Sequence, residues 1–407
     1  MPTAGQRVYV PITAKSVKGK MKVSNIGRTT IQNIDYTLSF NGRELESKHY
    51  VFPQALGHND DAVVEVEVPP YTELGEDELV FTITKVNGGR NGATISYANL
   101  PRITVTKVPK RRIAVEEYTA MWCRYCPTGI ALMENLSHTF GDDFVGIAVH
   151  TGDPLACWDY YSKAKGNRLP TVDMNRSHRL GYVLGVDEFK AEQEAGADMD
   201  LEVSAVWDES KNNITVTPVV AFRVNRDEAP YGFAYVLTED GMTDSRWVQN
   251  NAYSGSYGDR GVTKEFDEII DSPGEIRNLK NNFVAIAAEG VNVPVTGHVK
   301  APIKADTPLS HSFVFKDIKS KKVIQKKENL RVCVLLINTQ TGHVENAAKC
   351  VISEPKATAI SSVSDGTRSE VVVGRYTLDG RRITTPQRGI NIVRYSDGRV
   401  SKEVVTK

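Results

Sequence analysis

The sequence predicts a multidomain chain that combines β and α/β structure. Apolar and polar residues alternate before residue 110 and again after residue 199, which is typical of half-buried strands. Between these regions, an apolar run at 113–115 precedes apolar residues at helical spacing from Ile130 to Phe140. The length of 407 residues suits two to four domains.

Composition narrows the classes of function. The sequence holds 50 basic and 50 acidic residues, so its net charge of zero does not favour nucleic acid as a partner. No run of about 18 apolar residues is present, so we expect no transmembrane segment. The first residues, 1–6, lack a hydrophobic signal core. Either the protein is cytosolic or its signal peptide has been removed.

Residues 1–110 are expected to form an immunoglobulin-like β-sandwich. Three runs alternate between apolar and polar residues, at 34–40, 64–68 and 79–83. Each run is followed by a turn signal, such as Asn41-Gly42 after the first. Short strands at this spacing are typical of a sandwich.

Residues 111–198 change to an α/β pattern. The run 113–115 leads into Cys123-Arg124-Tyr125-Cys126, the only C-x-x-C of the sequence, and a helical pattern follows. Strand, C-x-x-C and helix in this order indicate redox chemistry rather than metal binding. The next apolar run, 144–150, suits a buried parallel strand. Because parallel strands end at the same edge of a sheet, we expect His150 and Asp153 near Cys123.

The position of the cysteine pair explains its expected reactivity. Unpaired N–H groups at a helix start carry partial positive charge and stabilise a thiolate. Cys123 is therefore expected to be the more exposed and more acidic thiol, with Cys126 one turn further in. Arg124 either lowers the pKa of the neighbouring thiol or simply points to solvent. Glu116 or Glu117 is either a buried carboxylate that shuttles a proton to the resolving thiol or a solvated charge at a strand end.

The segment Trp122–Pro127 resembles the thioredoxin active site, in which Trp precedes the first Cys. About 45 residues later, Leu169-Pro170-Thr171 resembles the cis-proline loop that faces the cysteines in that fold. The resemblance implies a thioredoxin-like domain over 111–198. It also implies an attacking thiol, a resolving thiol and a residue that positions the substrate backbone, namely Cys123, Cys126 and Pro170. We predict that the Leu169–Pro170 bond is cis.

Residues 199–355 return to a β pattern and are expected to form a second β-sandwich. A loop at 239–262, rich in Gly, Tyr and Asn, interrupts the strands, and loops of this length are usually functional or mobile. Its aromatic residues either form a stacking platform for a sugar or peptide or anchor the loop to its own domain. These residues are Trp247, Tyr253 and Tyr257.

Residues 356–407 are expected to form a linker and a small β tail. The linker, 356–365, is rich in Ser, Ala and Thr. Strand-like runs follow at 371–377, 389–395 and 400–406, with turn signals at Asp379-Gly380 and Asp397-Gly398. So small a segment cannot bury a core of its own.

Zinc is the competing interpretation of the C-x-x-C, but a structural site needs four ligands. Only Cys157, His150 and His178 remain to complete one, so we expect no metal and no cofactor. Cys157 is expected to be a buried apolar residue rather than a third redox thiol.

Cys333 and Cys350 flank a hairpin turn and should share one face. They form either a disulfide in a shifted register or two free thiols.

The motif from Glu116 to Gly129 resembles that of the 28-kilodalton outer-membrane-protein-related family of Gram-negative surface proteins. Ala120-Met121 stands where that family usually has Gly-Thr. Further likeness lies at 149–153, 237–241 and 337–347, so the match covers residues 111–355. It implies a fold and an exported location rather than a reaction.

The tail resembles a C-terminal sorting domain of the type IX secretion pathway, through Arg375–Arg382 and Gly389–Gly398, although it is shorter than most members. This likeness implies secretion machinery as a partner. Both likenesses imply export to the outer membrane, cell surface or periplasm, in a form whose signal peptide has been removed.

Two functions stay open on the sequence. The first is a thiol–disulfide oxidoreductase that acts on protein thiols or disulfides through Cys123 and Cys126. The second is a surface binding or adhesion protein that uses its thioredoxin-like domain as a scaffold, without catalysis. The sequence alone does not decide whether the protein is an enzyme.

Overall fold

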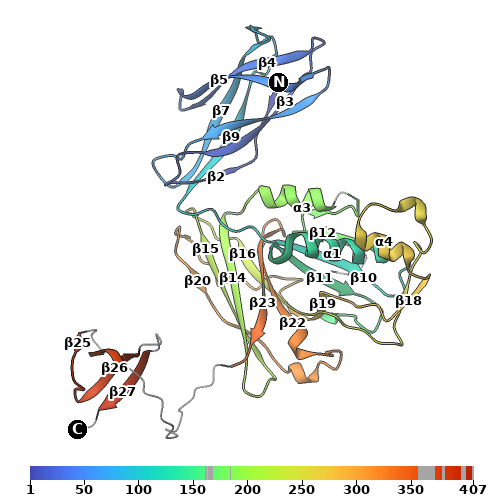
Figure 1. Ribbon diagram of the computed structural model, residues 1–407, viewed down its shortest axis with the longest axis vertical. Helices are drawn as coiled ribbons and strands as arrows, with labels where there is room; N and C mark the ends of the chain where they lie inside the picture. Colours follow the sequence, from blue (N-terminus) through green and yellow to red (C-terminus); the bar gives the residue numbers. More distant parts are fainter. Residues whose placement is uncertain are drawn as a thin grey trace. The chain divides into compact units, whose positions relative to one another are not determined.

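Figure 1 shows the computed structural model of the protein, which describes residues 1–160, 163, 168–183, 185–355, 372–377, 381–395 and 400–405. The chain divides into two compact units, with the boundary at residue 355. Strands dominate both units. Within the described residues, no helix is long and apolar enough to cross a membrane.

Residues 2–105 form two β-sheets around one apolar core. Every second residue of β6 (Asp61–Val68) turns inward, which buries Val64, Val66 and Val68. The smaller sheet has the order β1 (Pro2–Thr3), β3 (Val17–Ser24), β6. The larger sheet has the order β2 (Val8–Pro11), β9 (Tyr97–Val105), β7 (Gly75–Val86), β4 (Ile31–Phe40), β5 (Arg43–Leu56), with β8 (Gly89–Arg90) beside β7.

A 12-stranded sheet runs through the rest of the first unit. Its order is β13 (His178–Arg179), β12 (Thr171–Met174), β10 (Ile113–Thr119), β11 (Phe144–His150), β19 (Val284–Glu289), β16 (Tyr231–Glu239), β22 (Leu330–Asn338), β23 (Val344–Ser353), β14 (Met199–Trp207), β15 (Ile214–Phe222), β20 (Leu309–Ser310), with β21 (Phe313–Phe315) also beside β15. The pairs β10–β11, β11–β19 and β14–β23 are parallel. Alternate residues of β16 and β22 enter two different apolar clusters, so these central strands are buried on both faces.

This sheet contains strands from both sides of residues 198/199, where the sequence pattern predicted a domain boundary. β11 pairs with β19 through Ala148 and Val284, and Ala148 N donates to Phe283 O at 2.7 Å. The apolar runs identify both strands, but they do not specify which strands become neighbours. The α/β segment and the downstream β segment therefore share one sheet.

Two helices cover one face of β10, β11 and β12. Apolar residues of α1 (Pro127–Phe140) and α3 (Gly185–Glu194) pack with Val115 in one cluster. Phe140 of α1 stacks on Phe189 of α3, with ring centroids 4.2 Å apart. Of the residues at helical spacing in the sequence, Met133 and Leu136 are buried in this cluster and Phe140 packs against it, whereas Ile130 is half-buried and lies outside it.

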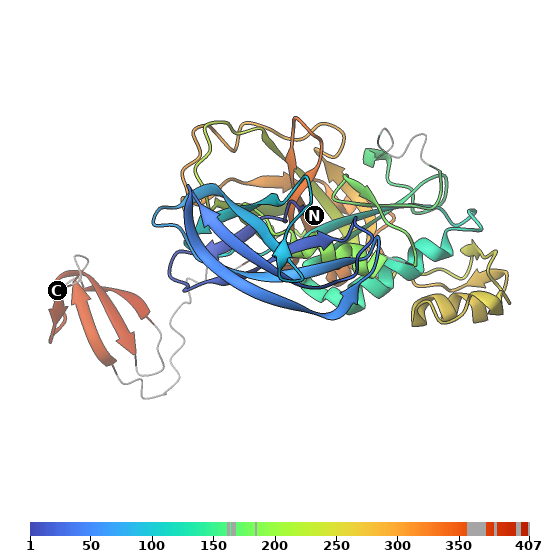
Figure 2. The ribbon, with the colours of Figure 1, turned by 90° about the horizontal axis from the view of Figure 1, so that it is seen from above.

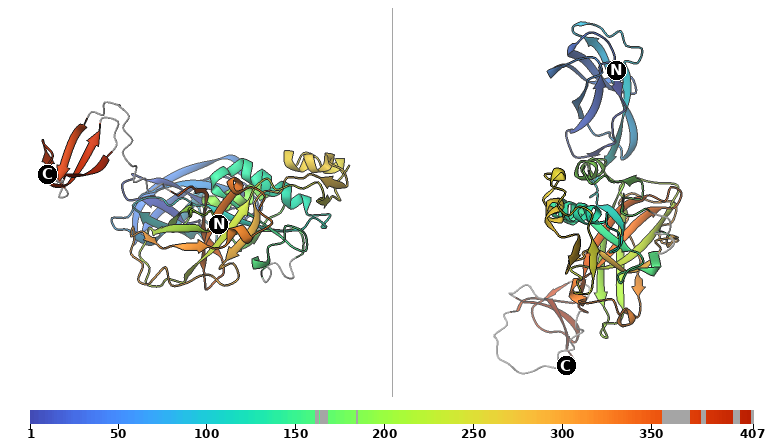
Figure 3. Two further views of the ribbon diagram at one scale, coloured as in Figure 1. Left: turned by 90° about the horizontal axis from the view of Figure 1, so that it is seen from below. Right: turned by 90° about the vertical axis from the view of Figure 1, so that its right-hand side faces the viewer.

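The segment 240–283, between β16 and β19, forms a cap beside α1. In the cap, β17 (Val248–Asn250) pairs antiparallel with β18 (Glu275–Arg277), and α4 (Lys264–Asp271) lies between them in the chain. Apolar residues of α4 pack on Ala131 of α1. Figures 2 and 3 show the two helices side by side.

Cys333 and Cys350 lie on opposite faces of the β22–β23 hairpin. Cys350 opposes Val332, while Cys333 opposes Lys349. Because opposed residues share a face and neighbours along a strand alternate, the two cysteines point apart. The expectation that they share a face is wrong: a bulge between Leu336 and Ile337 shifts the register by one residue. Both are free thiols.

The second unit holds a four-stranded sheet of order β25 (Arg382–Ile383), β24 (Val372–Thr377), β26 (Gly389–Tyr395), β27 (Val400–Val405). Its three longer strands occupy the strand-like runs recognised in the sequence. The linker expected at 356–365 and the turn signals Asp379-Gly380 and Asp397-Gly398 lie outside the described residues.

Candidate functional site

The cysteine pair lies on a tight turn between β10 and α1. All seven residues of β10 are buried, so the strand fixes the position of the turn that follows it. Cys123 N donates to Ala120 O at 3.1 Å, and Cys126 N donates to Cys123 O at 3.2 Å. A disulfide joins the two cysteines, with their Cα atoms 5.4 Å apart. Cys123 is 6% exposed and Cys126 is fully buried, which is the order of exposure expected from sequence.

Helix α1 begins directly after the second cysteine. Pro127 occupies its first turn, where no N–H is needed. The carbonyl of Cys126 accepts from Gly129 N at 2.9 Å and from Ile130 N at 3.2 Å. The disulfide therefore lies at the positive end of the helix dipole, where a thiolate is stabilised.

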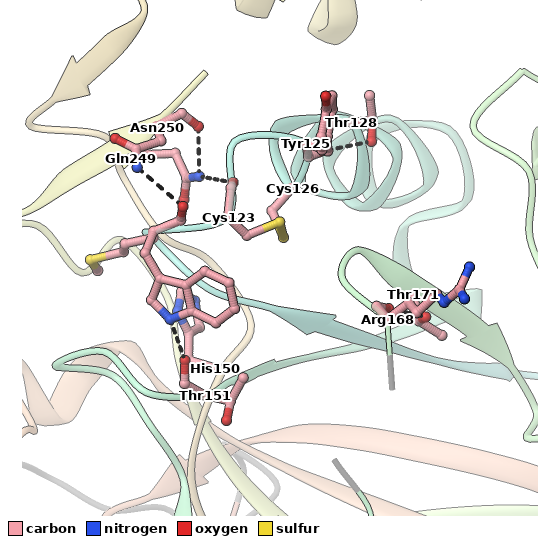
Figure 4. Close-up of a disulfide and its surroundings, with 12 residues drawn as sticks. Cys123, Tyr125, Cys126, Thr128, His150, Thr151, Arg168, Thr171, Gln249 and Asn250 are labelled. Atoms are coloured by element: carbon pink, nitrogen blue, oxygen red, sulfur yellow. Dashed lines mark hydrogen bonds between the residues drawn. A yellow bond between two sulfur atoms is a disulfide. The ribbon is translucent and has the colours of Figure 1, made fainter. Parts of the chain in front are cut away.

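The Leu169–Pro170 bond is cis, as predicted. β12 begins at the next residue and pairs with the end of β10, Thr171 opposite Tyr118. This pairing brings the proline loop to the cysteine turn. Leu169 packs against the small buried cluster of Ala120 and the two cysteines. Figure 4 shows Arg168 and Thr171 on one side of the disulfide and Gln249 and Asn250 on the other.

Two aromatic residues of the turn face solvent. Trp122 is 55% exposed and Tyr125 is 52% exposed. The indole Nε1 of Trp122 donates to Thr151 O at 3.1 Å, which fixes the ring beside the pair. The guanidinium of Arg124 is exposed and lies 5.4 Å from the centroid of the Tyr125 ring. These side chains give the site an apolar, partly cationic outer surface.

His150 and Asp153 lie beside the cysteine turn, as expected from the parallel strand order. The carboxylate of Asp153 accepts from Met121 N at 2.9 Å and contacts His150 Nδ1 at 2.8 Å. Both side chains are almost fully buried. Asp153 therefore fixes the start of the cysteine turn.

Glu117 is a buried carboxyl beneath the first turn of α1. Its side chain is 2% exposed, and a Cβ added at Gly129 would come within 2.5 Å of its Oε1. Among the described residues, Oε1 has no hydrogen-bond partner. Burial, with a smaller contribution from Glu134, raises the pKa of Glu117 to about 8. Glu117 is therefore mainly a neutral acid near pH 7.

Glu116 points to the opposite face and has full partners. Its two carboxylate oxygens accept from Arg176 Nε and Nη2, both at 2.7 Å, and Oε1 also accepts from Tyr160 Oη at 3.1 Å. Burial alone would raise the pKa of Glu116, but the Arg176 guanidinium holds it below its ordinary value. Of the two carboxyls left open by the sequence, Glu116 has an ion-pair partner, whereas Glu117 has none within the described part of the chain.

A cavity of about 10 Å³ adjoins Glu117, and Glu134, His150 and Asn282 also line it. A cavity of this size has room for about one water molecule. Glu134 Oε1 accepts from Asn282 Nδ2 at 2.7 Å. Burial raises the pKa of Glu134 as well. The cavity links the buried carboxyl to a second, partly exposed one.

The cap supplies a wall of the site that the sequence did not reveal. Gln249 Nε2 donates to Cys123 O at 3.0 Å, and Asn250 Nδ2 donates to Trp122 O at 3.1 Å. Asn250 N donates to Met121 O at 2.9 Å and Ala252 N to Arg124 O at 2.8 Å. The only sequence signal was the length and composition of the loop.

The aromatic residues of that loop do not assemble into one platform. Trp247 packs against the large apolar core, whereas Tyr253 packs with α4, and only Tyr257 is largely exposed. Trp247 and Tyr253 therefore anchor the cap, which was the simpler of the two interpretations.

The remaining ligands considered for zinc lie apart from the pair. Cys157 is buried in another apolar cluster, and His178 pairs with Glu188 at the surface. Throughout the described part of the chain, no three His, Cys, Asp or Glu side chains are grouped to hold a metal ion.

Chemically, the site offers a two-electron dithiol/disulfide couple next to a neutral acid.

No protein-family model and no curated protein matches the sequence. Among solved structures, HBP35 of Porphyromonas gingivalis is similar over 73% of this chain and 99% of its own, with 15% identity and a TM-score of 0.44. A protein of Agrobacterium tumefaciens is similar over 64% of this chain and 99% of its own, with 13% identity and a TM-score of 0.34. These scores are low, so the function must be inferred from the site itself.

Proposed function

We propose that the protein is a thiol–disulfide exchange protein, with a thioredoxin-like domain over residues 111–198 and Cys123 and Cys126 as its redox pair. One observation carries the proposal: Glu117 is buried beneath the helix start that holds the disulfide, and its Oε1 has no hydrogen-bond partner among the described residues. Its pKa of about 8 is close to that of a thiol, about 8.5. Matched pKa values favour proton transfer between the two groups.

In the reducing direction, the Cys123 thiolate attacks one sulfur of a substrate disulfide. A mixed disulfide forms, and the other substrate sulfur leaves as a thiolate that takes up a proton. Glu117 first gives its own proton to water and then takes the proton of Cys126, whose thiolate attacks Cys123 Sγ. The second substrate thiolate leaves, and Cys123–Cys126 becomes a disulfide. Two electrons pass from the chain to the substrate, and the reverse sequence oxidises a dithiol.

We propose protein disulfides as the substrates. Trp122 and Tyr125 present exposed aromatic surface beside the pair, which suits an apolar peptide segment. Pro170, in the loop next to the pair, would position the substrate backbone. This assignment gives Cys123, Cys126 and Pro170 the roles expected from sequence.

An insulin-reduction assay with dithiothreitol as the electron source tests the proposal. We expect Cys123→Ser to abolish turnover and Cys126→Ser to trap a mixed disulfide with insulin. Cys157→Ser is the matched control, because Cys157 is a buried thiol outside the site. A wild-type protein without turnover would refute thiol exchange and favour a non-catalytic binding or adhesion protein.

We further propose that the protein is exported and associated with the outer membrane or cell surface. The family likeness of residues 111–355 and the sorting-type motif of the tail support this location. Immunodetection on intact and broken cells of the native host tests it: a cytosolic signal would contradict export, and a periplasmic signal would contradict only the association with the outer membrane or cell surface.

A further inference from the structure

The cap holds the cysteine turn by its backbone. We call residues 249–252 the clamp. Four consecutive carbonyls, those of residues 121–124, accept hydrogen bonds from the clamp, at 2.8 to 3.1 Å. Each bond joins segments more than 120 residues apart in sequence, such as Asn250 to Trp122 with a separation of 128.

The clamp is itself held from behind. Asn251 N donates to Gly274 O at 2.8 Å, and Asn251 Nδ2 donates to Ile269 O at 2.8 Å. Gly274 precedes β18, and Ile269 lies in α4. The clamp is therefore a rigid support for the turn rather than a loop that merely touches it.

Gln249 is the member of the clamp that reaches Cys123 itself. Its Nε2 donates to Cys123 O and to Asn250 O, both at 3.0 Å. Its side chain is 2% exposed, and its Oε1 has no partner among the described residues. A buried amide oxygen without a partner destabilises the fold, so another benefit must offset its position here.

We propose that Gln249 is a positioning residue for the thiol of Cys123. This inference rests on the proposed exchange function and adds to it a residue outside the α/β segment. By bonding the Cys123 carbonyl, Gln249 holds the nucleophile in the orientation for in-line attack. It also places an N–H dipole, positive end first, beside the residue that becomes a thiolate.

Gln249→Met keeps the volume but removes the donor. We expect kcat/KM for insulin to fall about tenfold, because small misplacements of a nucleophile cost this much or more. The loss should be in kcat, with KM unchanged, since buried Gln249 does not touch substrate. Asn25→Leu is the matched control: Asn25 is also 2% exposed and also donates to two backbone carbonyls, but in the N-terminal sandwich. It should leave kcat unchanged.

Gln249→Glu distinguishes the hydrogen bond from simple packing. A neutral carboxylic acid can donate to Cys123 O, whereas the ionised form cannot. Burial raises the pKa of such a carboxyl into the assay range. We therefore expect the rate of Gln249→Glu, divided by the wild-type rate, to fall from pH 5 to pH 8. The same ratio for Gln249→Met should stay flat.

A readout independent of turnover separates the two proposals. The readout is iodoacetamide labelling of Cys123 at pH 6 in the reduced full-length protein, followed by mass spectrometry. In Gln249→Met, loss of the N–H dipole should raise the pKa of the Cys123 thiol. A rise of about half a unit lowers the reactive thiolate fraction about threefold, so labelling should slow at least about threefold. If wild type does not reduce insulin but this shift appears, the exchange function fails and the positioning role stands. If wild type reduces insulin and Gln249→Met matches it in rate and labelling, the positioning role is refuted. If neither turnover nor the shift appears, both proposals fail.

Discussion

Glu117 is a side chain that the fold keeps neutral at the expense of stability at high pH. Its pKa is about 8 in the folded protein and about 4.3 in an unfolded chain. Between these values the folded state binds the extra proton, so stability decreases as pH rises from 4 through 8. The carboxyl that suits proton transfer is thus also a weak point of the fold.

Glu117→Gln should remove this penalty. Below pH 4 the variant should match wild type, and above pH 8 it should be more stable by up to about 5 kcal/mol, while losing exchange activity. Urea unfolding between pH 4 and pH 9 measures the difference. Glu209→Gln, at an exposed position, is the control and should change neither property. A pH-independent difference would mean that Glu117 is ionised in the folded state.

Cys123 should react before Cys126 once the disulfide is reduced. It keeps 6% of its surface exposed, whereas Cys126 keeps none, and it precedes the helix start. Iodoacetamide at mildly acidic pH should label Cys123 first, as read by mass spectrometry. Equal or reversed labelling would contradict the assignment of Cys123 as the attacking thiol.

Local motifs predict some site residues and miss others for a physical reason. Short patterns identify Cys123, Cys126 and Pro170 as candidates, and the structure brings the two cysteines and the loop of Pro170 together. Strand alternation separates Glu116 from Glu117, but both faces of β10 are buried, so only the partners distinguish them. Gln249 follows no pattern, because its role depends on where a long loop packs.

At the scale of elements, Gly129 shows how closely α1 approaches β10. An added Cβ would lie 2.5 Å from Glu117 Oε1. In an ordinary helix, Gly→Ala stabilises by about 1 kcal/mol. Here we expect Gly129→Ala to destabilise by about 1–3 kcal/mol, because the carboxyl must move within a packed interior.

Urea unfolding at pH 7 measures this change in the free energy of unfolding. Gly92→Ala is the control, since an added Cβ there meets no atom within 4 Å. Stabilisation by Gly129→Ala would show that Glu117 moves aside freely and does not support the turn.

Periodicity predicts elements better than it predicts their neighbours. The runs at 113–115 and 144–150 became β10 and β11, and the helical stripe became α1. The pairing of β11 with β19 depends on residues far along the chain and has no local signal. A single-residue bulge in the β22–β23 hairpin likewise reverses the faces of Cys333 and Cys350.

At the scale of the molecule, residues 356–407 should be dispensable for the first unit. As far as the structure describes the chain, the sheet of the tail contains only strands of its own unit. Deleting 356–407 should leave the thermal unfolding and redox behaviour of residues 1–355 nearly unchanged, and abolish surface delivery in a native host. Calorimetry and cell fractionation measure the two effects. If the shortened chain aggregates, the tail is an integral part of the fold rather than a sorting segment.

The clamp also sets an order of events during synthesis. Trp122 is made 128 residues before Asn250, its partner in the clamp. At about 5–20 residues per second, this interval lasts roughly 6 to 25 seconds. For that time the cysteine turn exists without the wall that later holds it, open to any thiol or disulfide in its surroundings. The cysteine turn must therefore form before the backbone contacts of the clamp are available to it.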